Sequence, residues 1–404
     1  MSGGWSRFAL RFSRYYASLS TNELWTPPRL RNREWMFIQW GDKPVDRHRA
    51  FSSDESLLSY LQQKGPHSSF HSTAYYRKPS ERKMIDKDWL GADLIFDLDG
   101  DHLPGVSDAD FPSMISLIQE QAWSLWNDFL EPEFNMKREF AQFTFSGHRG
   151  FHIHYRDPDL IHLSSDARRE LVSHIRGEGV DVQSTLLKSE VGDLNGWQKR
   201  LESGLDGLLD KLQSIHAKEE NYTQIVNELE GGMRSMLERG QLGGAPYSAA
   251  SIKKLASSVS EQKRLKQLRL KNFNVLPGSQ KKMLEKLLLS DSSVVLGSAG
   301  ETDEVVTIDT RRQIRWPTSL HGKSGMRVTE FGFDRLDPDK SNKFDAFSEA
   351  VVFSKSNTSE IKITSEEITF EFFGNRKSPD KGDIITVSEA EAIFLTLKNW
   401  GEVC

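Results

Sequence analysis

The sequence contains one cysteine, Cys404, among 404 residues. A disulfide framework and a cysteine-based zinc site within the chain are therefore excluded, and a reducing intracellular compartment is expected. No apolar run approaches the roughly 20 residues that a membrane-spanning helix needs, so no membrane partner is expected. The net charge is −5, so any nucleic-acid partner must be held by local basic patches rather than by the chain as a whole.

Acidic residues are absent from the first 22 positions, which carry Arg7, Arg11 and Arg14. A basic start that contains serine is compatible with a targeting peptide. We favour a first helix instead, because apolar residues are interspersed among the arginines and no small-residue cleavage site follows. Pro27-Pro28 then ends the segment.

The order of strand-like and helix-like segments predicts the domain organisation. Strand-like composition occurs at 33–40, 74–76, 92–99, 143–155, 304–308, 313–315, 361–364, 368–373 and 384–387. Helices are expected at 110–130, 164–177 and 389–399, and leucine recurs at helical spacing through 196–290, with a glycine-rich break at 240–244. We therefore expect an α/β fold of the α+β kind. Its sheet core would comprise 1–190 and 291–404, with a helical subdomain, 191–290, inserted between them.

Two carboxylates, Asp97 and Asp99, end the strand-like segment 92–99. Residues two apart on a strand point to the same face, and neighbouring carboxylates are unfavourable unless a cation lies between them. Oxygen ligands favour Mg²⁺ or Mn²⁺, and two such ions about 3.5–4 Å apart can activate a hydroxyl and stabilise a phosphate leaving group. Asp309, after the strand-like 305–308, is the candidate third carboxylate. The alternative is a solvated strand end.

A glycine-containing turn, Ser146-Gly147-His148-Arg149-Gly150-Phe151-His152, joins two strand-like segments. Its glycines allow close backbone approach, and exposed N–H groups can bind an anion. Ser146, Arg149 and His152 add a hydroxyl and basic donors, so the turn suits a triphosphate. The alternative is a zinc-like pair of His152 and His154, which the absence of cysteine and the charge of Arg149 disfavour; His154 alone is otherwise a core histidine.

A second basic loop spans Ser319–Gly325. Its Gly-Lys-Ser fragment resembles the end of a Walker A motif, but Pro317 stands where that motif needs glycine, and no helix pattern follows. His321 and Lys323 still suit a phosphate contact. The alternative is a surface turn.

The segment 251–290 holds ten Lys or Arg residues and two Glu. A local basic face of this kind can attract a phosphate backbone, and the alternative is a solvated helix face.

The order of these motifs resembles the small catalytic subunit of archaeal and eukaryotic DNA primases. It is D-x-D after a strand, then S-G-x-R-G-x-H, then a lone Asp before S-L-H-G-K-S-G. Further similar segments are Arg14-Tyr15-Tyr16, Arg33-Glu34-Trp35 with the later Arg47, His48 and Phe51, and Ala74-Tyr75-Tyr76 before Trp89. The resemblance covers the chain except for about 190–290.

The resemblance implies a primase-type mixed-sheet core flanked by helices and a templated reaction. In that reaction a 3′-hydroxyl attacks the α-phosphate of a nucleoside triphosphate, making short RNA or DNA primers on single-stranded DNA. It implies that Asp97, Asp99 and Asp309 are catalytic and bind two Mg²⁺ or Mn²⁺ ions. The nucleotide contacts that it implies are Ser146, Arg149, His152, His321, Lys323, Arg47 and His48.

The resemblance also implies partners. These are a primase large subunit in a heterodimer, a single-stranded DNA template and nucleoside triphosphates, with a replicative DNA polymerase or helicase as further candidates. Family members commonly carry a Cys/His zinc site soon after D-x-D, but between Asp101 and Phe143 this chain has only His102, so no structural zinc is expected. The alternatives are a repair primase-polymerase on the same fold and a non-catalytic scaffold subunit.

Overall fold

The computed structural model describes residues 5–100, 107, 109–187, 196–238, 242–290 and 306–404. The chain divides into two compact units. The first, which we call the core unit, comprises Met1–Trp123, Arg138–Arg168 and Thr302–Cys404; the second, the helical unit, comprises Ser124–Lys137 and Arg169–Glu301. The predicted insertion 191–290 lies within the helical unit, which begins earlier in the chain. Asp101, His102 and the predicted helix start at Asp108 lie outside the described residues.

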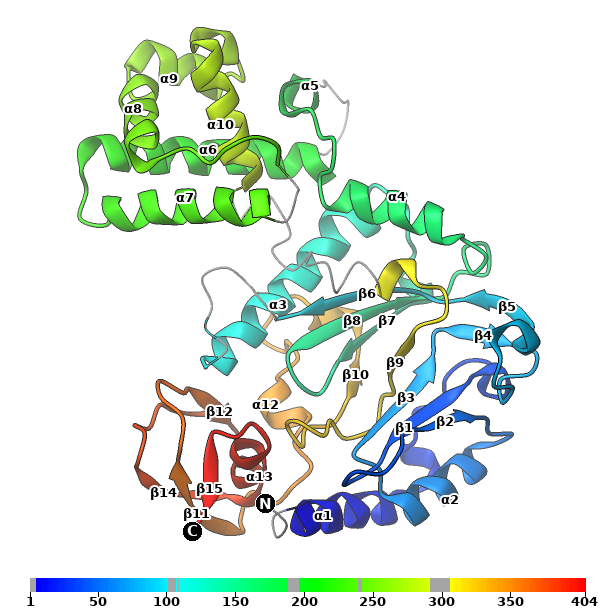
Figure 1. The fold of residues 1–404 in the computed structure, drawn as a ribbon. Helices are drawn as coiled ribbons and strands as arrows, with labels where there is room; N and C mark the ends of the chain where they lie inside the picture. The colour runs from blue at the N-terminus through cyan, green and yellow to red at the C-terminus, as the bar shows by residue number, and fades with distance from the viewer. Residues whose placement is uncertain (1–4, 101–106, 108, 188–195, 239–241, 291–305) are drawn as a thin grey trace. The chain divides into compact units, whose positions relative to one another are not determined.

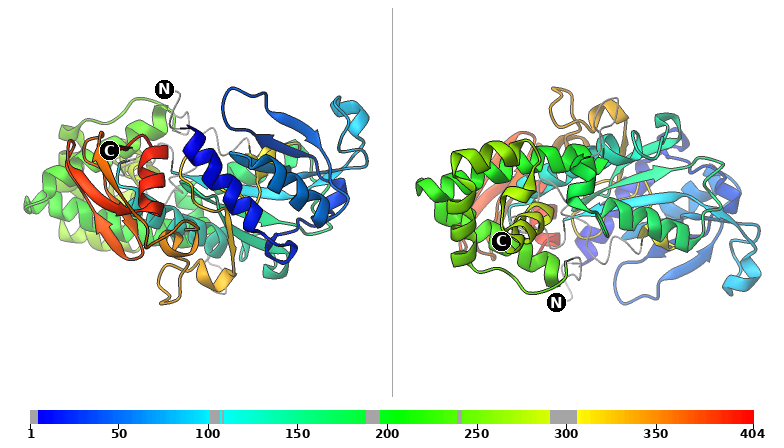
Figure 2. Two further views of the ribbon diagram at one scale, coloured as in Figure 1. Left: turned by 90° about the horizontal axis from the view of Figure 1, so that it is seen from below. Right: turned by 90° about the horizontal axis from the view of Figure 1, so that it is seen from above.

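The N-terminal sheet of the core unit has the strand order β2-β1-β3-β9, and all its pairings are antiparallel. Its strands are β1 (Trp35–Ile38), β2 (Asp46–Arg49), β3 (Ser68–Ser72) and β9 (Gln313–Arg315). The helices α1 (Trp5–Ser18) and α2 (Asp54–Lys64) lie side by side over this sheet (Figures 1 and 2). Phe12 of α1 is fully buried with Trp35 and Leu57, so the basic N-terminal segment is the predicted helix and packs by its apolar face.

The second sheet of the core unit has the order β10-β7-β8-β6, again antiparallel. Its strands are β6 (Leu94–Asp99), β7 (Ala141–Phe145), β8 (Gly150–Tyr155) and β10 (Thr329–Phe331). The predicted strand, turn and strand at 143–155 are thereby confirmed. The helix α3 (Phe111–Leu125) follows β6 in the chain, close to the predicted start. A separate two-stranded pair joins β4 (Ala74–Tyr76) and β5 (Trp89–Ala92).

The C-terminal part of the core unit forms a third, three-stranded sheet. Its strands are β11 (Thr358–Ile363), β14 (Ile384–Ser388) and β15 (Gly401–Val403), with β11 in the middle. The hairpin β12 (Phe370–Phe372) and β13 (Asn375–Lys377) and the short helix α12 (Ala346–Glu349) lie beside α13 (Glu389–Leu397) (Figure 1). Ser388 begins α13 with a capping box to Glu391. The predicted C-terminal strands and last helix are confirmed.

The helical unit contains the helices that the leucine spacing predicts within 196–290. They are α6 (Gly196–Ala217), α7 (Tyr222–Glu238), α8 (Ala249–Val259), α9 (Gln262–Arg269) and α10 (Gly278–Ser290). The helix expected at 164–177 is α4 (Ser165–Ile175), which begins in the core unit, and α5 (Val182–Leu187) was not predicted. Leu201, Leu205 and Leu208 of α6 are buried, as their spacing requires. Among the residues described, none of the helices is both long and apolar enough to cross a membrane.

Short helical turns complete the described structure. They are η1 (Thr21–Glu23), η2 (Leu30–Asn32), η3 (Met84–Lys87), η5 (Arg138–Phe140), η6 (Phe273–Val275), η7 (Phe333–Arg335) and the π-helical turn η4 (Trp126–Leu130). Residues 306–308 are also helical, so the strand predicted at 304–308 is wrong over its described part. Val306 packs with Ile95 and Ile314, so the apolar residues that suggested a strand serve tertiary packing. The fold is α+β.

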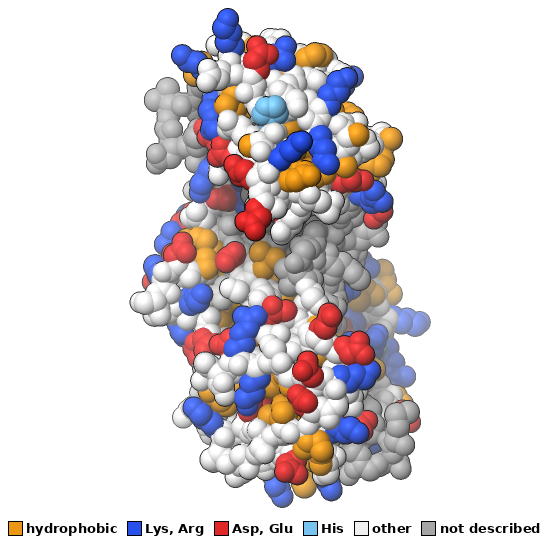
Figure 3. All heavy atoms as spheres, turned by 90° about the vertical axis from the view of Figure 1, so that its left-hand side faces the viewer, with side chains coloured by type: hydrophobic (Ala, Val, Ile, Leu, Met, Phe, Trp, Pro, Cys, Tyr) orange, Lys and Arg blue, Asp and Glu red, His pale blue; other side chains and the backbone are white. Residues whose placement is uncertain are grey.

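Basic residues of 251–290 are partly neutralised within the helical unit. Arg269 forms ion pairs with Asp206 and Asp210 of α6, at 2.9 and 2.6 Å, and Lys271 pairs with Glu202. In Figure 3 the helical unit occupies the upper part, where blue Lys and Arg side chains are interspersed with red acidic and orange hydrophobic ones. Part of the positive charge of 251–290 is therefore compensated by carboxylates of α6.

Candidate active site

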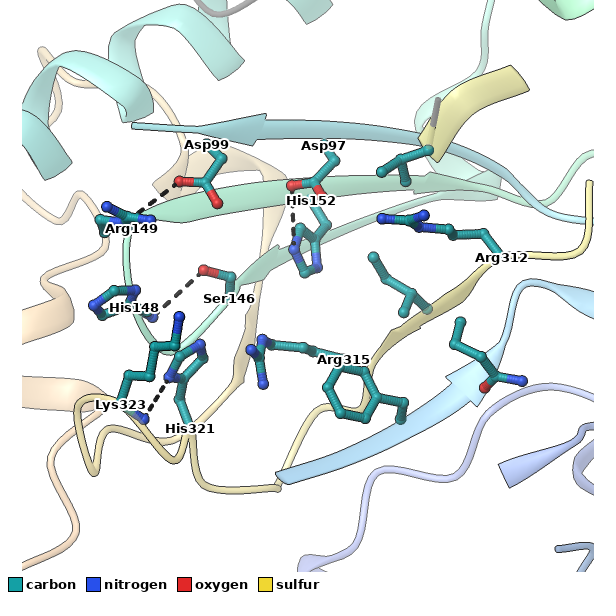
Figure 4. A pocket seen from close by; sticks show the side chains of 14 residues that line it. Asp97, Asp99, Ser146, His148, Arg149, His152, Arg312, Arg315, His321 and Lys323 are labelled. Atoms are coloured by element: carbon teal, nitrogen blue, oxygen red, sulfur yellow. Dashed lines mark hydrogen bonds and ion pairs between the residues drawn. The ribbon is translucent and has the colours of Figure 1, made fainter. Parts of the chain in front are cut away.

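A polar cavity of about 270 Å³ lies in the core unit (Figure 4). The second sheet contributes the two carboxylates of β6, and the turn between β7 and β8 lines the cavity beside them. Basic side chains come from β9 and the loop after it. Its polar lining residues are Asp97, Asp99, Ser146, His148, Arg149, His152, Arg312, Gln313, Arg315, His321 and Lys323. The cavity thus brings together seven of the ten site residues that the sequence suggested.

Strand register places the two carboxylates. In the β6–β8 pairing Asp97 lies opposite His152, and Asp99 lies opposite Gly150. The His152 Nε2 atom is 3.4 Å from an Asp97 oxygen, and Arg149 Nε is 3.8 Å from an Asp99 oxygen. Leu98, between the two carboxylates, is buried on the other face of the sheet. Alternation along β6 therefore directs both carboxylates into one cavity.

Burial shifts the protonation of the Asp97–His152 pair. Loss of water raises the pKa of Asp97 to about 6, although the positive charges of Arg312 and Arg315 oppose that rise. Burial likewise lowers the pKa of His152 to about 4. At neutral pH an ionised carboxylate therefore faces a neutral imidazole. The imidazole does not neutralise the Asp97 carboxylate. Asp97 and Asp99 therefore offer oxygen ligands that fit a divalent cation.

The turn between β7 and β8 is held by its own side chains. The Ser146 hydroxyl oxygen accepts hydrogen bonds from the N–H groups of His148 and Gly150, at 3.4 and 3.1 Å. Gly147 has φ +81°, and a Cβ at that position would stand 3.0 Å from the Cβ of His321. Glycine is therefore required there by both backbone conformation and space. Ser146 shapes the turn and still has its hydroxyl proton to donate.

The second basic loop is locked onto this turn. The Ser324 hydroxyl donates to the Gly147 carbonyl at 2.5 Å, and the His321 ring stacks on His148 with centroids 4.7 Å apart. Burial, reinforced by nearby cations, lowers the pKa of both histidines well below the usual value. Both rings are therefore neutral at physiological pH. The positive charge that Lys323 contributes lies beside this neutral stack.

Arg315 is a cavity residue that sequence reasoning missed. It comes from β9, its guanidinium lies 4.9 Å from the Phe70 ring, and burial lowers its pKa to about 10. It remains charged at neutral pH, close enough to influence both Asp97 and His321. The signal that could have found it is the cluster of arginines, 311–315, directly before the second basic loop.

Three predicted site residues lie elsewhere. Asp309 does not line the cavity, and its carboxylate accepts a hydrogen bond from the Arg311 N–H at 2.8 Å. Arg47 and His48 of β2 line a separate cavity of about 160 Å³, in which His48 Nδ1 is 2.7 Å from Glu34. Gln313 lines both cavities, so the two are neighbours. The roles of these three residues stay predictions.

Among the described residues, no ligand set for the zinc alternative is preformed. His154 is fully buried, and neither of its ring nitrogens has a hydrogen-bond partner among the described residues. Within that same part of the chain, no group of three or more His, Cys, Asp and Glu side chains is placed to hold a metal ion. The described carboxylates that line the cavity are Asp97 and Asp99.

A buried ionic network around Asp93, the residue directly before β6, joins segments that are distant in sequence. Asp93 accepts hydrogen bonds from Arg33 at 2.9 Å, Arg156 at 3.1 Å and the Tyr75 hydroxyl at 2.5 Å. Arg33 and Asp93 are both fully buried. The attraction of the two arginines outweighs burial and lowers the pKa of Asp93. This network fixes the strand that carries Asp97 and Asp99.

Comparison with known proteins identifies the family. A sequence model described as "DNA primase small subunit" matches residues 96–333, which include the cavity residues of both basic loops. The DNA primase small subunit PriS of Methanothrix thermoacetophila is 30% identical over 97% of each chain. Those of Methanospirillum hungatei and Methanocella arvoryzae are 32% and 31% identical, over 97% and 85% of this chain. They cover 95% and 85% of the respective relatives. The chain belongs to the DNA primase small subunit family.

Proposed function

We propose that this chain is the catalytic subunit of a DNA primase, which makes short RNA or DNA primers on single-stranded DNA. The observation that carries the proposal is the cavity in which two carboxylates, Asp97 and Asp99, face a basic wall that includes Arg315 and Lys323. That combination suits a nucleoside triphosphate whose reacting phosphate lies at the carboxylates. The names of the relatives favour this reading over a repair enzyme or a scaffold.

The chain's own residues would divide the chemistry between them. Asp97 and Asp99 would hold Mg²⁺ or Mn²⁺, which when bound lowers the pKa of a hydroxyl and offsets charge on the phosphates. Arg149, Arg315 and Lys323 would bind and orient the triphosphate. The 3′-hydroxyl gives up its proton to solvent and its oxygen forms a bond to the α-phosphorus. The bond from that phosphorus to the bridging oxygen breaks, and pyrophosphate leaves with the bridging oxygen and the electron pair of that bond.

A large subunit is the partner that we expect most directly. The relatives are named small subunits, and a small subunit implies a larger one. Single-stranded DNA and nucleoside triphosphates are the proposed substrates. A replicative DNA polymerase, which would extend the primer, and a replicative helicase are further candidate partners.

Synthesis on unprimed circular single-stranded DNA tests the proposal. Labelled ribonucleotides and deoxynucleotides are supplied separately with Mg²⁺, with Mn²⁺ or with a chelator. Short products that require a divalent cation are the expected result, and the two nucleotide arms report which primer is made. A chain that stays inactive with every cation, both nucleotide sets and the large subunit added would contradict the proposal.

A further inference from the structure

A second and larger cavity, of about 970 Å³, adjoins the active-site cavity within the core unit. The two share His148, Arg149 and Lys323, so these residues form a common wall. The far side of the larger cavity comes from the C-terminal part of the chain and includes Lys398 and Trp400 around the end of α13. We call it the C-terminal cavity. None of the site residues predicted from the sequence lies on that far side.

The common wall lies at one end of the active site. Figure 4 shows Arg312 at one end, Asp97 near the middle, and Arg149, His148 and Lys323 at the other end, where Asp99 lies beside Arg149. A triphosphate whose α-phosphate lies at the carboxylates would extend its other two phosphates toward the cations of the common wall. Bond cleavage would then leave the pyrophosphate against that wall, next to the C-terminal cavity.

Lys398 supplies a cation beyond the common wall. Its Nζ lies 3.3 Å from His148 Nε2, which is neutral at physiological pH and can accept a hydrogen bond from the ammonium group. The same ammonium stands 4.9 Å from the Phe111 ring centre and 4.8 Å from that of Trp400. These contacts hold the cation at a fixed place on the cavity side of His148.

The charge distribution of the C-terminal cavity favours a small anion over a long one. Lys323, Arg149 and Lys398 are cations of its lining, whereas the exposed carboxylates Glu366 and Glu402 belong to the same lining. A continuous DNA backbone passing through would meet both signs of charge. A pyrophosphate ion can bind the cations, whereas the carboxylates, of which Glu366 pairs with Lys381 at 3.1 Å, limit how tightly it is held.

We propose that the C-terminal cavity receives the pyrophosphate released by nucleotidyl transfer, and that Lys398 binds it after it leaves Arg149 and Lys323. The inference rests on the proposed function and deepens it, since it assigns the leaving group a route. Pyrophosphate carries away the bridging oxygen and the electron pair of the broken bond, so no additional reactant is needed. Lys398 is a product-binding residue in this scheme, distinct from the catalytic carboxylates.

Pyrophosphate binding to the intact chain tests the proposal without requiring synthesis. Titration calorimetry with magnesium pyrophosphate compares wild type, Lys398→Gln, Lys398→Arg and the control Lys343→Gln, which changes an exposed lysine outside both cavities. We expect Lys398→Gln to weaken binding by roughly tenfold, because a hydrogen bond to a charged group is lost. Lys398→Arg should restore most of the affinity, and Lys343→Gln should match wild type.

Product inhibition supplies the second readout. Lys398→Gln should need a higher pyrophosphate concentration to inhibit primer synthesis, while the KM for nucleotide stays near that of wild type. Thermal melting of each variant establishes that it is folded. Lys398→Gln that binds pyrophosphate as wild type does would overturn the proposal, as would a variant that loses single-stranded DNA or nucleotide affinity instead. A wild type that makes no primers but shows Lys398-dependent pyrophosphate binding would contradict the proposed function and support the binding site.

Discussion

The His152 imidazole lies against Asp97, with its Nε2 3.4 Å from a carboxylate oxygen, and His152 is almost fully buried. Burial pushes the two pKa values in opposite directions, to about 6 for Asp97 and about 4 for His152. At neutral pH the pair is therefore a carboxylate beside a neutral ring. The imidazole does not neutralise the Asp97 carboxylate, and a cation bound there would stabilise its ionised form.

Asp97→Asn should stabilise the metal-free protein at pH 7.5. The folded-state pKa of about 6 exceeds the ordinary 3.8, so the folded protein binds more protons and loses stability as pH rises from about 4 through 6. The asparagine variant does not lose this stability, so its free energy of unfolding at pH 7.5 should exceed that of wild type by about 3 kcal/mol at most. Urea unfolding in chelator at pH 7.5 and 4.5 measures it, with exposed Asp42→Asn as control. A gain equally large at pH 4.5 would contradict the explanation.

Arg315→Met should shift the pH dependence of cation binding upward. The guanidinium of Arg315 opposes the rise in the pKa of Asp97, so its removal would raise that pKa further, and Mn²⁺ binding would need higher pH. Nucleotide affinity should also fall by roughly tenfold, because one charged phosphate contact is lost. Mn²⁺ titrations across pH 5–8 test the first effect. Arg315→Lys keeps the charge and should leave the pH midpoint near that of wild type; a midpoint unmoved in Arg315→Met would refute the coupling.

Lys323→Ala should weaken nucleotide binding more than DNA binding. Lys323 lies at the common wall, where the distal phosphates of a triphosphate would lie, and a point charge there contributes to phosphate affinity. Calorimetry with nucleotide and anisotropy with labelled single-stranded DNA measure the two affinities. Exposed Lys343→Ala is the matched control. Equal losses for both ligands would remove the loop from the nucleotide site.

Asp93→Asn should destabilise the fold. Two arginines and a tyrosine donate to this buried carboxylate, and loss of its charge leaves the guanidinium groups of Arg33 and Arg156 uncompensated. Breaking a buried pair of this kind typically costs about 3–5 kcal/mol. Denaturant unfolding measures the loss, and Asp88→Asn, which changes an exposed ion pair with Arg77, should have little effect. Unfolding curves of Asp93→Asn that match wild type would contradict a supporting role.

Local pattern was sufficient to predict the carboxylates and the glycine turn. Asp97 and Asp99 are two apart on a strand whose apolar residues identify it, so their shared face follows from strand geometry. The glycine-containing turn between two strands was predicted, and the structure adds that Gly147 has a positive φ. The order of the three motifs indicated the family, and the comparison with the family model confirms that the chain belongs to it.

The local sequence pattern could not predict which distant segments pair in the folded chain. Arg315 enters the site because β9 pairs with β3, where it lies opposite Phe70, far away in the sequence. The segment before Asp309 was expected to be a strand, but 306–308 form a helical turn whose Val306 packs into an apolar cluster. The catalytic role of Asp309 stays a prediction. Periodicity over five residues does not separate a short strand from a helical turn held by packing.

Primer synthesis on unprimed single-stranded DNA by wild type and by the Asp97→Asn, Asp99→Asn double variant tests whether the two carboxylates are catalytic. Both are assayed with the large subunit present and after melting curves show that each is folded. Wild type should make short products that require a divalent cation, and the double variant should make none. Synthesis by the double variant at the wild-type rate would contradict the assignment of Asp97 and Asp99 as the catalytic carboxylates.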